Sequence, residues 1–157
     1  MGGGSVLLML ALINVWFIRA LLTSRHDDHS CEVLEVEPDD AYLRHVLRVH
    51  RVDVLKHQPD FEWNGAAPGN RAYLVQRGDE TVGVVLLHDA GDGVAQIVLD
   101  CVTPRFQDFS PDEFVWRKSG LLTSSGFTRV VTPANMRSPY YDQIGFRRFE
   151  GAFTLDL

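Results

Sequence analysis

The chain has 157 residues, of which 45% are hydrophobic and 23% are charged, a composition typical of one globular domain and not of a disordered or fibrous chain. Its 15 Lys and Arg against 21 Asp and Glu give a net charge of −6, so no basic surplus is present to neutralise a nucleic-acid backbone. The two cysteines, Cys31 and Cys101, form no CxxC or Cys/His pattern, which argues against a disulfide scaffold or a zinc site. We therefore expect neither a nucleic-acid partner nor a metal.

The N-terminal segment is much more apolar than the rest of the chain. Residues 6–22 read VLLMLALINVWFIRALL, in which Asn14 and Arg19 are the strongly polar residues. As a helix this segment measures about 25 Å, which matches a locally thinned bilayer if Arg19 reaches the interface. We predict a membrane anchor; a cleaved secretory signal and a helix docked on soluble protein are the alternatives.

Basic residues set the expected orientation of this anchor. Arg19 and Arg25 follow the apolar run and no basic residue precedes it, so the positive-inside rule places the C-terminal part in the cytoplasm as a single-pass protein. Asn14 could hydrogen-bond to a helix of another membrane-protein subunit. We interpret residues 1–5 as a flexible linker, 23–31 as a charged linker and 32–157 as the folded domain.

The first half of this domain has one helix and three strands in its pattern. Residues 38–40 (PDD) predict a helix start with an Asp as N-cap, followed by apolar residues at helical spacing over about 16 residues before Pro59. Strands are predicted at 72–76, 81–88 and 96–102, separated by turns at Gly78-Asp79 and residues 90–93. The middle of the chain therefore predicts an antiparallel meander.

The second half alternates helices and strands. Residues 111–125 predict a helix closed by Gly126 at the C′ position, and residues 129–132 (RVVT) predict a strand. A short helix is expected within 135–144, and one or two strands within 145–157. The order α, β, β, β, α, β, α, β predicts an α+β fold with a mixed, mostly antiparallel sheet flanked by helices.

This order, together with the segment YYDQIGF at residues 140–146, resembles the GNAT superfamily of N-acetyltransferases. Residues 53–61 and 99–114 are similar to acetyltransferase-type domains appended to bacterial inner-membrane proteins. The resemblance implies transfer of an acetyl group from acetyl-CoA to an amine, by a domain on the cytoplasmic side of the bacterial inner membrane. It does not name the amine.

The resemblance also implies a binding segment for the CoA pyrophosphate, with the pattern R/Q-x-x-G-x-G/A between a strand and a helix, where glycines let backbone N–H groups reach the anion. Gln107 matches the first position, whereas Ser110 and Asp112 stand where the pattern has glycines. The cofactor-binding candidates implied in this way are Val102, Gln107, Asp108, Phe109, Ser110 and Asp112.

The same segment also reads as a helix N-terminus. Ser110 to Glu113 form a capping-box pattern with Pro111 at the first helical position. Its two carboxylates would repel a pyrophosphate by roughly 1 kcal/mol per charge pair in water and about 4 kcal/mol at an effective dielectric near 20. This favours the alternative function, a catalytically silent accessory or assembly subunit of a membrane protein complex.

Transfer needs a base for the amine and an acid for the departing thiolate. The resemblance implies Tyr141 as the acid, with Tyr140 as the neighbouring candidate; covering the sheet edge is the structural alternative. Asp100, on the strand at 96–102, is the candidate base, and capping a bulge or pairing with an arginine is its structural alternative. Cys101 alternates with Asp100 and is expected to face the opposite side, in the core.

Overall fold

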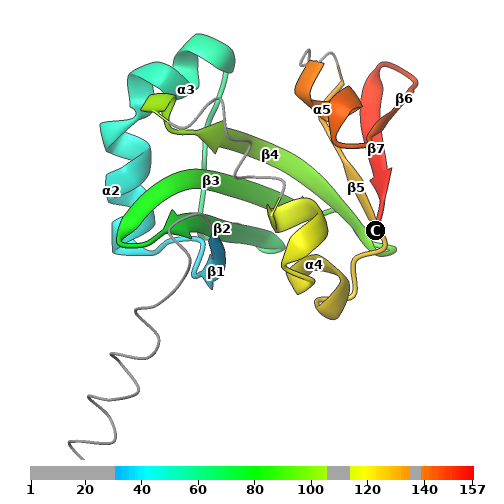
Figure 1. Cartoon of the computed structure of the whole chain (residues 1–157), viewed down its shortest axis with the longest axis horizontal. Helices are drawn as coiled ribbons and strands as arrows, with labels where there is room; N and C mark the ends of the chain where they lie inside the picture. Colours follow the sequence, from blue (N-terminus) through cyan, green and yellow to red (C-terminus); the bar gives the residue numbers. More distant parts are fainter. Residues whose placement is uncertain (1–30, 106–113, 135–138) are drawn as a thin grey trace, which may run out of the picture. The chain divides into compact units, whose positions relative to one another are not determined.

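A seven-stranded sheet with the order β1-β2-β3-β4-β5-β7-β6 forms the centre of the domain (Figure 1). The computed structural model describes residues 31–105, 114–134 and 139–157. The strands are β1 Glu32–Val36, β2 Asn70–Arg77, β3 Glu80–Asp89, β4 Val94–Val102, β5 Arg129–Val131, β6 Arg147–Phe149 and β7 Ala152–Asp156. Neighbouring strands are antiparallel except for β4 and β5, which are parallel. The predicted α+β class and mostly antiparallel sheet are confirmed.

The first half of the domain confirms the meander and adds a strand. β2, β3 and β4 pair in sequence order, as predicted. The edge strand β1, which pairs with β2 from Glu32 to Val36, was not predicted. Its residues EVLEV do not alternate strictly, because Val33 and Leu34 are adjacent and both are only half-buried.

The predicted single helix before Pro59 is two helices. Asp40 is the N-cap of α2 (Ala41–Val49), as predicted, and its carboxylate accepts hydrogen bonds from the backbone N–H groups of Tyr42 and Leu43 at 2.8 and 3.1 Å. The helix ends at His50, which has a φ of −94° and a ψ of 12°. α3 (Arg51–His57) then starts from the same residue. The prediction of one uninterrupted helix was therefore wrong.

The second half of the domain has shorter helices than the sequence predicted. A π-helical turn, η2 (Phe114–Lys118), is followed by α4 (Leu121–Ser124), and Gly120 between them has a φ of 67°. Because this left-handed conformation interrupts a right-handed helix, the helix predicted over 111–125 is wrong in its described part. Gly126 follows the C-cap residue Ser125 with a φ of 88°, as predicted. α5 (Pro139–Gln143) and the two strands β6 and β7 complete the chain.

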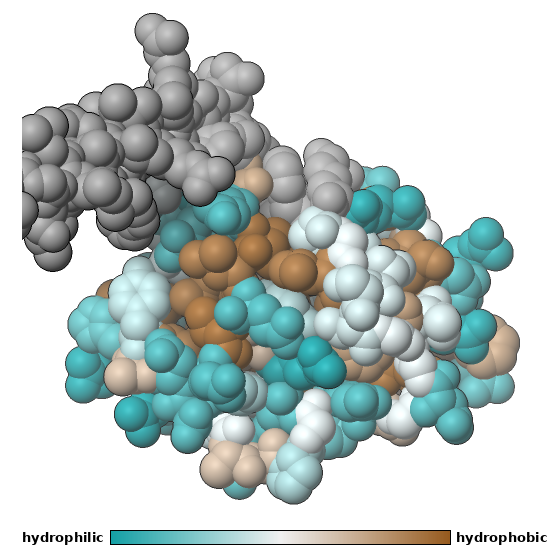
Figure 2. All heavy atoms as spheres, turned by 90° about the horizontal axis from the view of Figure 1, so that it is seen from below, coloured by the Kyte–Doolittle hydropathy of each residue, from teal (hydrophilic) through white to brown (hydrophobic). Residues whose placement is uncertain are grey.

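Each face of the sheet is covered by a hydrophobic core. On one face, α2 and α3 supply Leu43, Val46 and Val54, which pack on alternate residues of the meander such as Leu74 and Leu86. The opposite face packs against η2, α4 and α5. It includes the buried residues Tyr73, Val85, Ile97, Val115, Trp116, Leu122, Tyr141, Phe146 and Phe153. Elsewhere, hydrophobic side chains reach the surface in patches between hydrophilic ones (Figure 2).

The described part of the chain bears only partly on membrane attachment. Within residues 31–105, 114–134 and 139–157, no helix is long and apolar enough to cross a membrane. Residues 6–22, the predicted anchor, lie outside this part, so the anchor stays a prediction.

Candidate functional site

The two parallel strands at the centre of the sheet pair at one end only. Hydrogen-bonded register between β4 and β5 covers Val94–Gln96 and Arg129–Val131, whereas β4 continues to Val102. Figure 1 shows the two strands diverging beyond this point. Over residues 97–102, the edge of β4 that faces β5 is therefore not paired with β5. Backbone N–H and C=O groups on such an edge can pair with an extended ligand.

A β-bulge in β4 decides which face carries the polar residue of this segment. Leu86 is opposite Leu99 and Leu87 is opposite Ile97, so Val98 is an extra residue without a cross-strand partner. Ile97 faces the core of η2 and α4, whereas both Val98 and Leu99 face the core of α2 and α3. After this double step, Asp100 lies opposite Val85 and therefore on the η2 side of the sheet. If β4 alternated strictly from Ile97 onward, Asp100 would face the α2 side instead.

The carbonyl group of the bulge has a partner from a distant loop. Gln58 is the C-cap residue of α3, and its side-chain Nε2 donates a hydrogen bond to the carbonyl oxygen of Val98 at 3.0 Å. The bond is partly buried, and a bond of this kind contributes about 1 kcal/mol when both partners are satisfied. Gln58 therefore holds the bulge and, through it, the orientation of Asp100.

Tyr141 and Asp100 meet on the open side of β4. The hydroxyl group of Tyr141 in α5 donates a hydrogen bond to Oδ2 of Asp100 at 2.9 Å. Tyr141 is only 3% exposed, and its ring packs against Phe146 and Phe153 with centroid distances of 5.0 and 5.4 Å. Two aromatic neighbours and one carboxylate thus fix the position of the phenol. A phenol bonded to a carboxylate can pass a proton in either direction along this bond.

The other residues singled out from the sequence are only partly described by the structure. Val102 is the last residue of β4 and is half-buried. Cys101 packs against the α2 core, as predicted from its alternation with Asp100. Tyr140 belongs to α5, but its side chain is not described. The rest of the predicted cofactor segment, Gln107, Asp108, Phe109, Ser110 and Asp112, lies outside the described residues.

Sequence reasoning missed Gln58 and the bulge. Gln58 lies between a helix and Pro59, and its partner Val98 is 40 residues away, so no local pattern connects the two. A weak signal was available in QIVLDCV, where three apolar residues in a row precede Asp100. With strict alternation along the strand, Asp100 would have shared a buried face with Val98, two residues earlier.

Metal-ligating side chains do not cluster in the described part of the chain. No group of three or more His, Cys, Asp or Glu side chains within residues 31–105, 114–134 and 139–157 is placed to hold an ion. The chemistry available at the open edge of β4 is proton transfer by a phenol and a carboxylate.

Comparison with known proteins supports the fold. No family model matches the sequence, and no curated protein matches it. An acetyltransferase from Bacillus subtilis in complex with CoA is similar in structure, with a TM-score of 0.55 and 17% identity over 82% of this chain and 99% of that chain.

Two further solved structures resemble the chain. An acetyltransferase of the GNAT family from Staphylococcus aureus has a TM-score of 0.58 and 10% identity, covering 82% of this chain and 99% of that one. IAA acetyltransferase from Bacillus cereus has a TM-score of 0.55 and 12% identity, covering 82% and 100%. These identities are low enough that the likeness establishes the fold alone. The domain therefore has the fold of the GNAT acetyltransferases, as its sequence resemblance predicted.

Proposed function

We propose that the domain transfers an acetyl group from acetyl-CoA to an amine at the open edge of β4. The hydrogen bond between Tyr141 and Asp100 carries this proposal, because it puts a proton donor and a carboxylate together on the stretch of β4 that extends beyond its pairing with β5. The GNAT-like fold is the second support, and the CoA complex of the B. subtilis acetyltransferase is compatible with it.

Two residues supply the proton transfers that aminolysis of a thioester needs. As the new C–N bond forms and the C–S bond breaks, the Asp100 carboxylate accepts the proton that the amine loses. The Tyr141 hydroxyl gives its proton to the departing thiolate and recovers one from the Asp100 carboxylic acid through their hydrogen bond. Because a carboxylic acid is a much stronger acid than a thiol, the coupled transfer is favourable overall. Both residues return to their starting states.

The stretch of β4 that extends beyond its pairing with β5 suits the pantetheine arm of acetyl-CoA. This arm is extended and carries two amide groups, which can pair with strand backbone as an added strand does. We propose that residues 97–102 hold it and that Val102 and the Gln107–Asp112 segment hold the pyrophosphate. The carboxylates of Asp112 and Glu113 would weaken this part of the site.

A catalytically silent domain is the second candidate. It is favoured by the acidic residues in the predicted phosphate segment and by the 3% exposure of Tyr141. In this role the bond between Tyr141 and Asp100 would join α5 to β4 as a structural contact, and the domain would serve in assembly of a membrane protein complex.

We further propose that residues 6–22 anchor the protein in the bacterial inner membrane, with the domain in the cytoplasm. The support is the apolar run itself and the arginines that follow it. Membrane fractionation tests this proposal: the full chain should sediment with membranes and resist carbonate washing, whereas recovery of the full chain in the soluble fraction would contradict it.

Acetyl-CoA binding and turnover separate the two functional candidates. The free energy of unfolding of the full chain is measured in mild detergent, with and without acetyl-CoA. Thiol release from acetyl-CoA is followed separately with a panel of amines. A ligand at 100 times its dissociation constant raises the free energy of unfolding by about 2.7 kcal/mol. Stabilisation together with amine-dependent thiol release would support the transferase.

Each other outcome has a defined meaning. No stabilisation at millimolar acetyl-CoA contradicts the transferase and supports the silent domain. Stabilisation without thiol release for any amine also contradicts the proposed catalysis. Equal stabilisation by free CoA would then show that the chain binds the cofactor without using its acetyl group. Pantetheine alone serves as the control for the β4 edge, because it lacks the pyrophosphate that the acidic segment would repel.

A further inference from the structure

A hollow of about 760 Å3 lies beside α2 and α3, and the loop of residues 59–63 completes it. Its volume is within the range of about 300 to 1,000 Å3 that sites for small ligands occupy. The apolar residues in its lining belong to the core on the α2 face of the sheet, whereas Tyr141 belongs to the core on the other face. In Figure 1, α2 and α3 are at the left and α5, which contains Tyr141, is at the right. The hollow is therefore distinct from the proposed acetyl-transfer site.

The floor of the hollow is apolar and held in place. Val54 is 3% exposed, and the rings of Phe61 and Trp63 are half-buried against the same core. Nε1–H of Trp63 donates to the carbonyl oxygen of Pro38 at 2.9 Å. The backbone N–H of Phe61 donates to the carbonyl oxygen of Gln58 at 3.1 Å. The two rings thus offer an apolar surface that is already formed, as ligand sites usually do.

The helices supply three arginines to the lining. Arg44 and Arg48 are about one turn apart on α2, and Arg51 is the first residue of α3. All three are exposed. Nη2 of Arg48 lies 3.1 Å from Nδ1 of His45, and within the described residues none of the three arginines forms an ion pair with a carboxylate. Their guanidinium groups are therefore available to a carboxylate of a ligand.

The loop supplies two carboxylates to the same hollow. In the segment DFEW, the exposed Asp60 and Glu62 alternate with the half-buried Phe61 and Trp63. Neither carboxylate forms an ion pair or a hydrogen bond with the described residues, although three arginines line the same hollow. The positive and negative side chains are consequently held apart, with an apolar floor in the same lining.

This arrangement restricts the chemistry of a ligand. A purely anionic ligand would leave the two carboxylates without a partner, and a purely cationic one would leave the arginines without a partner. A short peptide with free ends has an anion at one end, a cation at the other and side chains between them. An extended tripeptide is about 10 Å long, so its ends can reach groups that do not contact each other.

We propose that this hollow binds short peptides with free ends. The terminal carboxylate lies at the three arginines, the terminal ammonium group lies at Asp60 and Glu62, and an apolar side chain covers the two aromatic rings of the floor. The proposal does not depend on acetyl transfer, because no residue of the proposed transfer site lines the hollow.

Four forms of one peptide test this proposal. The tripeptide Ala-Phe-Ala is compared with its N-acetylated form, its C-terminal amide and the form with both modifications. Binding to the full chain in mild detergent, without acetyl-CoA, is measured by isothermal titration calorimetry, and titration into detergent alone is subtracted. We expect each modification to weaken binding about three- to tenfold, the range for one partly exposed charge pair.

Variants of the arginines assign the carboxylate end. Combined Arg44→Gln, Arg48→Gln and Arg51→Gln should make the free acid and the amide bind equally, while the preference for a free amine remains. Arg147→Gln is the matched control, because this exposed arginine lies on β6, outside the hollow. An equal effect of Arg147→Gln would show a general influence of net charge and would overturn the proposal.

Variants of the acidic residues assign the ammonium end. Asp60→Asn combined with Glu62→Gln should remove the preference for a free amine and keep the preference for a free carboxylate. Equal binding of all four peptides by the unchanged protein would overturn the proposal, as would the absence of binding at millimolar peptide. Both of these readouts hold even if a variant does not fold, and neither bears on acetyl transfer.

Discussion

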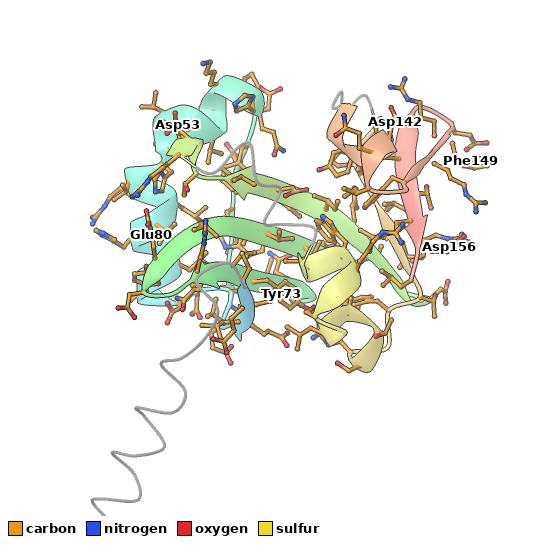
Figure 3. The ribbon with its side chains drawn as sticks, in the orientation of Figure 1. Asp53, Tyr73, Glu80, Asp142, Phe149 and Asp156 are labelled. Atoms are coloured by element: carbon orange, nitrogen blue, oxygen red, sulfur yellow. The ribbon has the colours of Figure 1, made fainter. Side chains whose placement is uncertain are left out.

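Two buried tyrosines on the same face of the sheet differ in what surrounds their hydroxyl groups. Tyr73 is 0% exposed and Tyr141 is 3% exposed, and both belong to the core beneath η2 and α4. The Tyr141 hydroxyl donates to Asp100, in the part of β4 that extends beyond its pairing with β5. Tyr73 lies in β2, which is paired on both sides by β1 and β3. Figure 3 marks its position in the sheet.

The surroundings of Tyr73 keep it protonated. Burial, followed by the nearby negative charge of Glu35, raises the pKa of Tyr73, and the neighbouring Arg71 and Ser125 oppose this rise without cancelling it. The charge of Glu35 is itself engaged by Arg71 at 2.9 Å, and the Arg71 guanidinium lies 5.3 Å from the centre of the Phe127 ring. Burial and the charge of Glu35 thus both disfavour ionisation of Tyr73, whereas the Tyr141 hydroxyl donates directly to a carboxylate with which it can exchange a proton.

Removing the Tyr141 hydroxyl group gives the largest expected effect. Tyr141→Phe should lower kcat for the proposed acetyl transfer about 100- to 10,000-fold, the range for loss of a general acid, while the Phe ring keeps its contacts with Phe146 and Phe153. Thiol release at saturating acetyl-CoA measures this loss. Tyr73→Phe is the matched control and should leave kcat unchanged.

A variant of Asp100, the hydrogen-bond partner of Tyr141, tests whether the two residues act together. Asp100→Asn should cause a loss of similar size, and the double variant should be little worse than either single one, because residues that act as a unit are not additive. Multiplicative losses in the double variant would contradict a coupled proton path. An unchanged kcat in Tyr141→Phe would leave Tyr141 with only the structural role of Tyr73.

Gln58 tests whether the bulge positions Asp100. Gln58→Leu removes the donor to the Val98 carbonyl and should destabilise the domain by about 1 kcal/mol. A displaced carboxylate should lower kcat about 10- to 100-fold, with little change in KM for acetyl-CoA. The control Gln96→Leu alters an exposed glutamine on the same strand, before the bulge. Equal kcat values in both variants would show that Gln58 has no positioning role.

The two tyrosines also show what the sequence could predict. Tyr141 was found from its place in the YYDQIGF segment, which carries the GNAT resemblance, and Asp100 from its place on a predicted strand. Their contact could not be predicted, because it depends on the divergence of β4 from β5 and on the bulge at Val98. Both features follow from packing between strands and not from local pattern.

The fold was predicted correctly where apolar and polar residues alternate along a strand and where turn residues separate the strands. The meander follows from strands separated by turns, in which Gly78 has a φ of 61°. The edge strand β1 was missed because it is short and carries Glu32 and Glu35, both exposed. The break at His50 was missed because apolar residues keep helical spacing across it. Their spacing therefore gives no sign that the backbone leaves the helical conformation there.

The smallest expected effect is a pH dependence of stability that belongs to Tyr73. Its pKa is raised in the folded state, mainly by burial, so folding favours the protonated form. The stabilisation is fully present below the pKa of an unfolded tyrosine, about 10, and is lost as the pH rises through the higher folded value. Tyr73→Phe lacks this loss. Between pH 9 and 11, its free energy of unfolding should fall less steeply than that of the unchanged protein.

Urea unfolding at a series of pH values measures the free energy of unfolding of the unchanged protein and of Tyr73→Phe. The difference between the two isolates the titration of Tyr73, because all other groups titrate in both proteins. At pH 8, Tyr73→Phe should change stability by less than about 1 kcal/mol, because no group meets strict hydrogen-bond geometry with the buried hydroxyl, although Arg71 and Ser125 are near enough to lower its pKa. Tyr42→Phe is the matched control, since Tyr42 is 47% exposed and its hydroxyl contacts Thr81 at the surface. Identical slopes in all three proteins would show that Tyr73 is as free to ionise as a surface tyrosine, and its contrast with Tyr141 would then rest on Asp100 alone.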